Sequence, residues 1–274
     1  MQVFIGKNSG FCRGVKNAVD TAMSVKVGNT YILGEIIHNA DVVEAIARRG
    51  IIQVDNLEDV PDGATVIFRS HGVPLSFYDD CRRRNITVID CTCKFVNNTQ
   101  KIVKRMHEEG KFIVICGEPT HPEVIGLQGW CGNSALIVSD ENADLSAITD
   151  KDVCVVAQTT FSVQKFENII KNIKKLCEKS VAVFKTICYT TVGRQKEAEE
   201  LSEKCDAMIV IGGINSSNTT KLYDICKKHC DHVIRLTSAD EFEYEKIKNF
   251  NKVGIVSGAS TPNAQTREVL LKMD

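Results

Sequence analysis

Three cysteines stand at comparable places in the chain, each after a short β-branched run and before a stretch with helical periodicity. They are Cys12, Cys93 and Cys188. The positive end of a helix dipole favours a thiolate, and thiolates hold iron–sulfur clusters and zinc. Four irons held by only three thiolates would leave one iron open to a substrate. The spacing alone leaves three interpretations open: a 4Fe-4S cluster, a zinc ion, or no ligand.

The chain has twelve cysteines, and most of the others are predicted to fill the core. No CxxC pair occurs, which argues against a zinc finger formed by the cysteines of one short segment. Cys81 and Cys131 stay undecided. The predicted core cysteines lie inside expected strands or helices: Cys116, Cys154, Cys177, Cys205, Cys226 and Cys230.

Hydrogen-bond donors gather at the expected strand ends. His38, His71 and His121 are three of only six histidines, and each stands at such a junction. Hydroxyls, amides and helix N-termini at the same junctions can bind anions, which predicts a pocket for a multiply charged anion such as a diphosphate. The chain has no GxxxxGK motif, so a nucleotide P-loop is excluded. The further donors are Thr159, Ser216, Ser217, Asn218 and Ser260.

Glu123 is the one carboxylate within these motifs. An acid beside an anion pocket can deliver a proton, and burial would raise its pKa and keep it protonated. The alternative is a first-turn helix residue favoured by the helix dipole. Taken by itself, the position favours this alternative.

The elements that would position these residues repeat three times along the chain. Each cysteine precedes a predicted helix, and each repeat then has two buried-looking strands that end in polar motifs. From the cysteine to the first of these motifs the distances are 26 residues (12 to 38), 28 (93 to 121) and 28 (188 to 216). The helices are expected over 13–25, 94–110 and 189–205, and the strands over 31–36, 64–69, 111–117, 152–157, 207–213 and 252–257.

Short apolar strands that alternate with helices predict βαβ units and parallel sheets, so the expected class is α/β. Ligands of such sheets bind beyond the carboxyl ends of the strands, where the polar motifs stand. Three units around a pseudo-threefold axis, a trefoil of small α/β domains, would direct all these motifs toward one central cavity.

Composition narrows the range of partners. The 274 residues are 43% hydrophobic and carry a net charge of −1. No basic stripe indicates nucleic acid, and no apolar run is long enough for a bilayer, so neither partner is expected. The sequence starts with the strand-like MQVFIG, without the pattern of a signal peptide. A cytoplasmic protein is therefore expected, in a reducing compartment where cysteines serve metals, catalysis or the core.

Taken together, the motifs resemble those of the 4-hydroxy-3-methylbut-2-enyl diphosphate reductases, the LytB family. The resemblance runs from Gly10 to Ser260, and the motifs occur in the family's order. They are GFCRGV (10–15), IIHN (36–39), RSHGV (69–73), THPEVIG (120–126), QTT (158–160), TIC (186–188) with RQ (194–195), NSSN (215–218) and SGAS (257–260).

The resemblance implies a trefoil of α/β domains over 13–93, 94–187 and 188–274, with the strand in 1–12 completing the third. It implies one 4Fe-4S cluster on Cys12, Cys93 and Cys188. The diphosphate would bind at His38, His71, His121, Ser216, Ser217, Asn218 and Ser260, with Thr159 near the substrate hydroxyl. Glu123 would deliver the proton.

The implied reaction is the reductive removal of the hydroxyl of 4-hydroxy-3-methylbut-2-enyl diphosphate, the last step of the non-mevalonate isoprenoid pathway. Two electrons and two protons would give isopentenyl and dimethylallyl diphosphate. Reduced ferredoxin or flavodoxin would supply the electrons, because the sequence has no flavin or nicotinamide motif. The product ratio, the donor itself, the oligomeric state and the extent of domain closure do not follow from the sequence.

One motif departs from the family. The usual Ala-Thr-Cys-Pro is here Cys91-Thr92-Cys93-Lys94. Position favours Cys93 as the ligand, with Cys91 as the alternative, and the loss of proline could loosen the helix start.

Two other functions are alternatives to the reductase. Quinolinate synthase resembles the same three-lobed, three-cysteine plan, but the THPEV and NSSN motifs speak against it. A non-catalytic zinc or scaffold protein would contain zinc without iron or sulfide.

Overall fold

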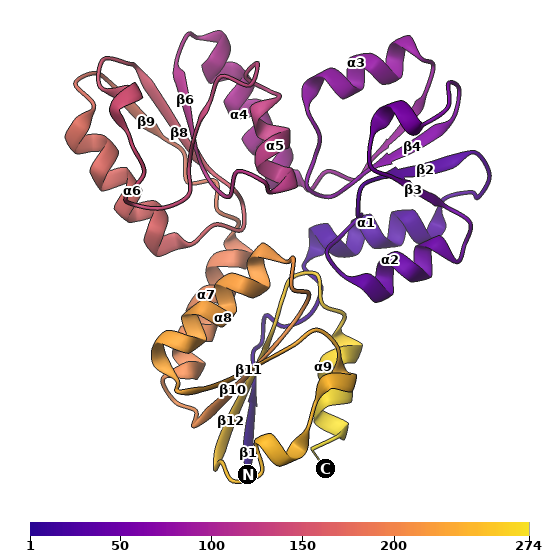
Figure 1. Ribbon diagram of the computed structural model, residues 1–274, viewed down its shortest axis with the longest axis vertical. Helices are drawn as coiled ribbons and strands as arrows, with labels where there is room; N and C mark the ends of the chain where they lie inside the picture. Colours follow the sequence, from indigo (N-terminus) through magenta and orange to yellow (C-terminus); the bar gives the residue numbers. More distant parts are fainter. Residues whose placement is uncertain (274) are drawn as a thin grey trace. The chain divides into compact units, whose positions relative to one another are not determined.

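Twelve strands form three separate four-stranded sheets in residues 1–273, the range that the computed structural model describes (Figure 1). Every strand pair in these sheets is parallel. Parallel neighbours need a crossover, and helices supply it between successive strands. The predicted α/β class with parallel sheets is therefore confirmed.

The first sheet has the strand order β3-β2-β4-β5. Its strands are β2 (Thr30–Leu33), β3 (Ile52–Val54), β4 (Thr65–Phe68) and β5 (Thr87–Asp90), and its helices are α1 (Arg13–Ser24), α2 (Ala40–Ala47) and α3 (Leu75–Arg83). The second sheet has the order β7-β6-β8-β9. It contains β6 (Phe112–Cys116), β7 (Leu136–Val138), β8 (Val153–Ala157) and β9 (Val181–Val183), with α4 (Lys94–Glu108), α5 (Pro122–Gln128) and α6 (Val163–Leu176).

The third sheet joins the two ends of the chain, in the order β1-β12-β10-β11. The N-terminal strand pairs with the last one, with Val3 opposite Val253. Figure 1 shows α7 and α8 on one face of this sheet and α9 on the other. The elements are β1 (Gln2–Ile5), β10 (Ala207–Ile211), β11 (His232–Leu236), β12 (Lys252–Ser257), α7 (Tyr189–Ser202), α8 (Ser217–His229) and α9 (Asn263–Leu271).

Both faces of these sheets are covered, and the side chains of a strand alternate between two cores. On β10, Ile209 packs toward Val269 of α9, whereas Met208 and Val210 pack toward Leu222 of α8. Central strands β8 and β10 are buried at all five of their positions. Such continuous burial explains why they stand out in the sequence as uninterrupted apolar runs.

Each sheet also has a fourth strand that the sequence pattern does not predict. These strands are β3, β7 and β11, and each pairs with only one neighbour at the edge of its sheet. β3 and β7 have three residues each, and two of the three in β3 are exposed. A short, half-exposed edge strand has too few alternating positions for its period to be recognised.

By its contacts the described chain forms two compact units. The larger unit comprises 17–37 and 43–187 and holds the first two sheets. The smaller unit comprises 1–16, 38–42 and 188–274 and holds the third. The proposed three-domain limits and the trefoil arrangement around a central cavity stay predictions.

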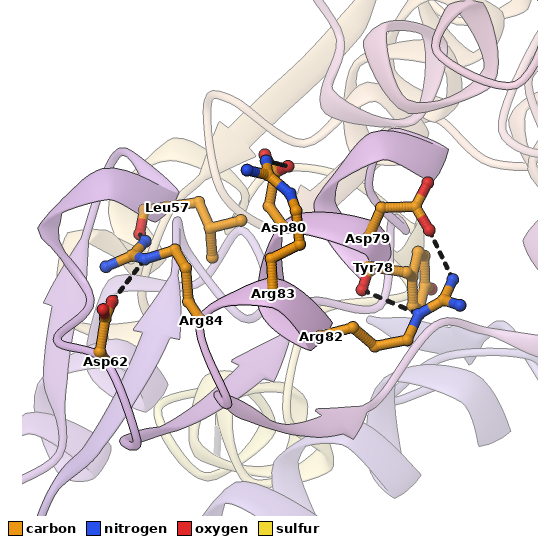
Figure 2. Close-up of polar contacts among 8 residues, drawn as sticks. All are labelled: Leu57, Asp62, Tyr78, Asp79, Asp80, Arg82, Arg83 and Arg84. Carbon is orange, nitrogen blue, oxygen red and sulfur yellow. Dashed lines mark hydrogen bonds and ion pairs between the residues drawn. The ribbon is translucent and has the colours of Figure 1, made fainter.

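The C-terminal end of α3 is tied to the loop that precedes β4 (Figure 2). Arg84 bonds the Asp62 carboxylate at 2.6 Å and the Leu57 carbonyl oxygen at 2.9 Å. Arg82 pairs with Asp79 at 2.5 Å on the exposed face. Exposed pairs of this kind contribute only about 0–1 kcal/mol each, so the carbonyl bond of Arg84 matters more for holding the loop.

Among the described helices, none combines the length and the apolar character that a bilayer-spanning segment requires.

Candidate functional site

All three predicted ligand cysteines stand at helix N-termini. Cys12 directly precedes α1, and Cys93 and Cys188 are the N-cap residues of α4 and α7. Each is partly exposed and is not part of a disulfide. The Cys12 Sγ accepts the Val15 backbone N–H at 3.4 Å, and the Cys188 Sγ lies 3.1 Å from Thr190 Oγ1. Backbone N–H groups and the helix dipole stabilise thiolates here, so the donor set fits an iron–sulfur cluster.

Cys91 has a different environment from Cys93. Burial raises the pKa of the Cys91 thiol to about 11, although a hydrogen bond with Thr21 acts in the opposite direction. A group with this pKa stays protonated at neutral pH and is a poor metal ligand. Cys93 instead is the N-cap of α4, and its backbone N–H donates to the Ser70 carbonyl oxygen at 3.0 Å, next to His71. These observations favour Cys93 over Cys91.

His121 caps the helix that carries Glu123. The His121 Nδ1 accepts the Glu123 backbone N–H at 3.1 Å, and Pro122 occupies the first turn of α5. Because Nδ1 is an acceptor in this bond, the proton of the neutral imidazole lies on Nε2. The cap therefore makes Nε2 a hydrogen-bond donor, as an anion pocket requires.

Glu123 is only 1% exposed and is held by Thr159. The Thr159 backbone N–H donates to Oε1 at 2.6 Å, and its hydroxyl donates to Oε2 at 2.7 Å. Burial raises the pKa of Glu123 to about 7, and the two Thr159 bonds oppose this shift. The carboxyl group can therefore hold or release a proton near neutral pH, with a hydroxyl in contact to pass it on.

Two histidines of the larger unit lie together. The ring centroids of His71 and His121 are 5.4 Å apart, edge to face. Cys93 contacts Ser70, the neighbour of His71, and Glu123 is bonded to Thr159. The larger unit therefore holds five predicted site residues near the ends of β4, β5, β6 and β8. They are His71, Cys93, His121, Glu123 and Thr159.

The smaller unit gathers the hydroxyl groups. The Ser216 hydroxyl caps α8 through Thr219 N at 3.3 Å, and the Ser260 hydroxyl donates to Ser216 at 3.5 Å. Asn218 is 3% exposed, and neither atom of its amide has a hydrogen-bond partner within residues 1–273. Buried polar groups normally have partners, so this amide is suited to a polar ligand.

Close packing sets the start of α8. A Cβ at Gly258, in the SGAS motif, would lie 2.2 Å from the Thr219 hydroxyl, so only glycine fits. The Cys12 backbone N–H donates to Ala259 at 3.1 Å, which ties the first cysteine to this loop. The predicted residues Ser216, Asn218, Ser260 and Cys12 therefore share one edge of the third sheet.

The remaining two predicted residues also belong to the smaller unit. His38 is half-buried, and its carbonyl oxygen would lie 2.8 Å from a Cβ at Gly213, before the NSSN motif. Ser217 is half-buried and is the first residue of α8. The following Asn39 caps α2 by accepting the Val42 N–H at 3.1 Å.

Arg194 belongs to the RQ motif, and its type and position in the sequence predict no role, yet it is only 5% exposed. Its Nη1 donates to the Ser257 carbonyl at 2.8 Å and its Nη2 to the Gly10 carbonyl at 2.6 Å. Burial lowers the pKa of Arg194, and the negative charges of Cys12, Glu197 and Cys188 raise it. The guanidinium therefore lies within electrostatic reach of two predicted ligand cysteines.

A sequence signal could have found Arg194. Buried positions of α7 follow a helical period, and four of the five carry polar side chains: Thr191, Arg194, Gln195, Ala198 and Ser202. In α8 the buried positions change from Asn218 and Thr219 to Leu222 and Cys226. Polar residues on the buried face near a helix start indicate a site rather than a core.

The comparisons with known proteins all point to one family. A family model described as "LytB protein" matches residues 3–274. A curated protein of Clostridium tetani, named 4-hydroxy-3-methylbut-2-enyl diphosphate reductase, is 41% identical over 281 aligned positions. The alignment covers 100% of this chain but 44% of that protein, so the chain spans less than half of this relative's length. In other curated proteins with the same name, the match covers 96% to 98% of their length.

Two solved structures are similar over nearly the whole chain. The E-1-hydroxy-2-methyl-but-2-enyl-4-diphosphate reductase of Plasmodium falciparum is 27% identical, with a TM-score of 0.90, and the match covers 99% of this chain and 87% of that one. A second structure is described as (E)-4-hydroxy-3-methyl-but-2-enyl diphosphate reductase, the terminal enzyme of the non-mevalonate pathway. It is 36% identical, with a TM-score of 0.72, and the match covers 100% and 99% of the two chains.

Proposed function

Because the chain belongs to the LytB family, we propose that it is an oxidoreductase that removes the hydroxyl of 4-hydroxy-3-methylbut-2-enyl diphosphate. Two electrons and two protons enter, water leaves, and isopentenyl and dimethylallyl diphosphate form. This is the last step of the non-mevalonate isoprenoid pathway. The observation that carries the proposal is the buried Glu123 carboxyl group, held at both oxygens by Thr159.

Cys12, Cys93 and Cys188 would hold one 4Fe-4S cluster. Their support is that all three stand at helix N-termini outside any disulfide, with Arg194 buried near two of them. When bound, a cluster with one open iron would supply single electrons and a Lewis acid for the leaving oxygen.

The diphosphate would be held by donors from helix starts and strand ends. His121 offers Nε2–H because its Nδ1 caps α5, and Asn218 offers a buried amide. Helix N-termini add backbone N–H groups and positive dipole ends. The complete proposed set is His38, His71, His121, Ser216, Ser217, Asn218 and Ser260.

Glu123 would be the proton source. With a pKa of about 7, part of the population is protonated at neutral pH. Thr159 bonds both carboxylate oxygens. When Glu123 is protonated it would donate to the Thr159 hydroxyl, which would then turn its own proton toward the substrate oxygen. Removal of the proton-bearing group should therefore lower turnover more than substrate binding.

Reduced ferredoxin or flavodoxin would donate the electrons. A cytoplasmic location would suit the twelve cysteines, none of which is part of a disulfide, because the cytosol keeps thiols reduced.

The direct test is turnover of the hydroxylated allylic diphosphate by anaerobically purified protein, with dithionite and a viologen dye. We expect both olefinic diphosphates as products, and Glu123→Gln should bind the substrate but lose about 10²–10⁴-fold in rate. A wild-type protein with an intact cluster and no turnover would reject the reductase function. Unaltered turnover of Glu123→Gln would remove Glu123 from the mechanism.

Metal analysis of cysteine variants tests the cofactor separately. Cys93→Ser should lose iron and sulfide, whereas Cys91→Ser, the matched control two residues away, should retain both. If Cys93→Ser retained iron and sulfide and Cys91→Ser lost both, Cys91 would be the ligand in place of Cys93. One zinc per chain without iron or sulfide in the wild type would support the zinc alternative instead.

A further inference from the structure

Arg194 connects the two predicted ligand cysteines of the smaller unit. It lies on α7, the helix that begins directly after Cys188. Its Nη2 bonds the Gly10 carbonyl oxygen, in the loop that leads to Cys12, and its Nη1 bonds the Ser257 carbonyl oxygen at the end of β12. One side chain therefore reaches from the helix of one cysteine to the loop of the other.

Burying the positive charge of Arg194 at this place has a large free-energy cost. The side chain is 5% exposed, both of these hydrogen bonds end on neutral carbonyls, and Nε has no hydrogen-bond partner within the described range. A buried cation needs a nearby negative charge to offset its lost hydration. A buried N–H donor without a partner likewise indicates an acceptor that the protein itself does not provide.

The nearby negative charges identify what could balance this cation. Cys12, Glu197 and Cys188 are the anionic groups that act on Arg194. The Glu197 carboxylate accepts the Asn8 backbone N–H at 3.0 Å and the Asn8 amide at 3.2 Å, and these neutral donors leave its charge in place. Glu197 therefore supplies part of the counter-charge, and Cys12, which acts most strongly, supplies a further part together with Cys188 and an anionic group bound to the two sulfurs.

We propose that Arg194 is a positioning residue that also sets the reduction potential of the cluster. It holds the loop of Cys12 against the helix of Cys188, and its positive charge stabilises the reduced cluster more than the oxidised one. Reduction adds one negative charge, so a nearby cation raises the midpoint potential. This inference rests on the proposed function, because it needs a cluster on these cysteines.

The experiment compares the anaerobically reconstituted wild type with Arg194→Gln and Arg194→Lys. Iron and sulfide content, melting temperature and the midpoint potential in a redox titration are measured for each. Arg194→Gln should shift the midpoint to a more negative potential. Arg194→Lys keeps the charge but loses the planar fork, so it should melt earlier and keep a midpoint near that of the wild type.

The outcomes separate this role from a purely structural one. If Arg194→Gln melts earlier but has the wild-type midpoint, Arg194 is only a clamp and the proposal is overturned. If Arg194→Gln retains no iron, the midpoint potential of Arg194→Lys is the deciding measurement. A midpoint of Arg194→Lys near that of the wild type supports the proposal, and a clearly more negative midpoint overturns it. Loss of iron from the lysine variant too would show that the fork matters rather than the charge, which also overturns it.

Arg235 provides a matched control. It is an arginine of the same unit that also bonds main-chain carbonyls, those of Gly213 at 2.9 Å and Ile214 at 3.0 Å. Arg235→Gln should therefore leave the midpoint unchanged, and an equal shift in this variant would contradict a specific role for Arg194. A wild-type protein that binds no iron would reject the proposed function itself, whereas an intact cluster with an unshifted Arg194→Gln rejects only this inference.

Discussion

At the scale of single residues, position in the sequence and environment in the fold point to different roles for Glu123. Its place in the first turn of α5 suits a carboxylate that interacts with the helix dipole. Its burial at 1% exposure instead raises the pKa to about 7, because a charged carboxylate loses its hydration there. Burial is the larger effect, so Glu123 suits proton transfer better than helix stabilisation.

The raised pKa of Glu123 predicts a pH-dependent stability. In the unfolded chain Glu123 ionises near its usual pKa of 4.5, and in the folded protein it ionises at about 7. Its contribution to the unfolding free energy is therefore fully present below pH 4.5 and is lost as the pH rises through 7. Relative to Glu123→Gln, the wild type should lose roughly 3 kcal/mol of unfolding free energy across this window. Urea unfolding of both apoproteins at about pH 5 and about pH 8 measures the difference.

Glu167→Gln is the control for this measurement. Glu167 lies on the surface of α6, where it pairs with Lys185 at 3.0 Å. Its variant should follow the wild-type pH dependence. A stability difference between Glu123→Gln and the wild type that stays constant with pH would contradict the raised pKa.

At the scale of elements, the start of α4, capped by Cys93, is little disturbed by Lys94, which stands where the family usually has proline. Cys93 has φ −57° and ψ 137°, the extended conformation that a residue before proline also adopts. Lys94 is the first helical residue, whose N–H has no partner within a helix. The backbone of α4 therefore starts as the family's proline would require.

Lys94→Pro is accordingly expected to fold and to raise the unfolding free energy by about 0.5 kcal/mol, because proline restricts the unfolded chain. Urea unfolding measures this gain. Asn97→Pro is the contrasting variant, since the Asn97 N–H bonds the Cys93 carbonyl at 2.9 Å. It should cost about 3 kcal/mol. A Lys94→Pro protein as unstable as Asn97→Pro would show that α4 starts elsewhere.

At the scale of the whole molecule, close contacts join the first two sheets within the larger unit. Trp130, which follows α5, donates its Nε1–H to the Val73 carbonyl at 3.0 Å. A Cβ at Gly129 would lie 2.4 Å from the Cβ of Pro74. The segment that carries His71 is thus packed directly against the helix that carries Glu123.

Gly129→Ala should therefore destabilise the protein by about 1–3 kcal/mol, because its methyl group overpacks this contact. Thermal or urea unfolding measures the loss. Gly193→Ala is the control: Gly193 lies inside α7, whereas Gly129 is the C-cap of α5, and the nearest atoms to a Cβ added at Gly193 are 3.7 Å away. Its stability should stay equal or rise by up to about 1 kcal/mol. Equal stabilities of the two variants would argue against the close packing at Pro74.

Local patterns were enough to predict much of this protein. Apolar runs of β-branched residues predicted the central strands β8 and β10, because strands buried on both faces show little else. Helical periodicity placed α4 and α7 directly after Cys93 and Cys188. These features depend on neighbours within one element, which is why the α/β class and the position of each predicted ligand at a helix start follow from local sequence.

Which residues become buried beside one another depends on the folded chain. Val3 pairs with Val253, Thr159 encloses the Glu123 carboxylate, and Arg194 reaches the Gly10 loop across 184 positions of the sequence. Short edge strands such as β3 likewise depend on a partner strand rather than on their own pattern. Burial, and with it the raised pKa of Glu123, arises from groups far away in the chain, and no local period contains that information.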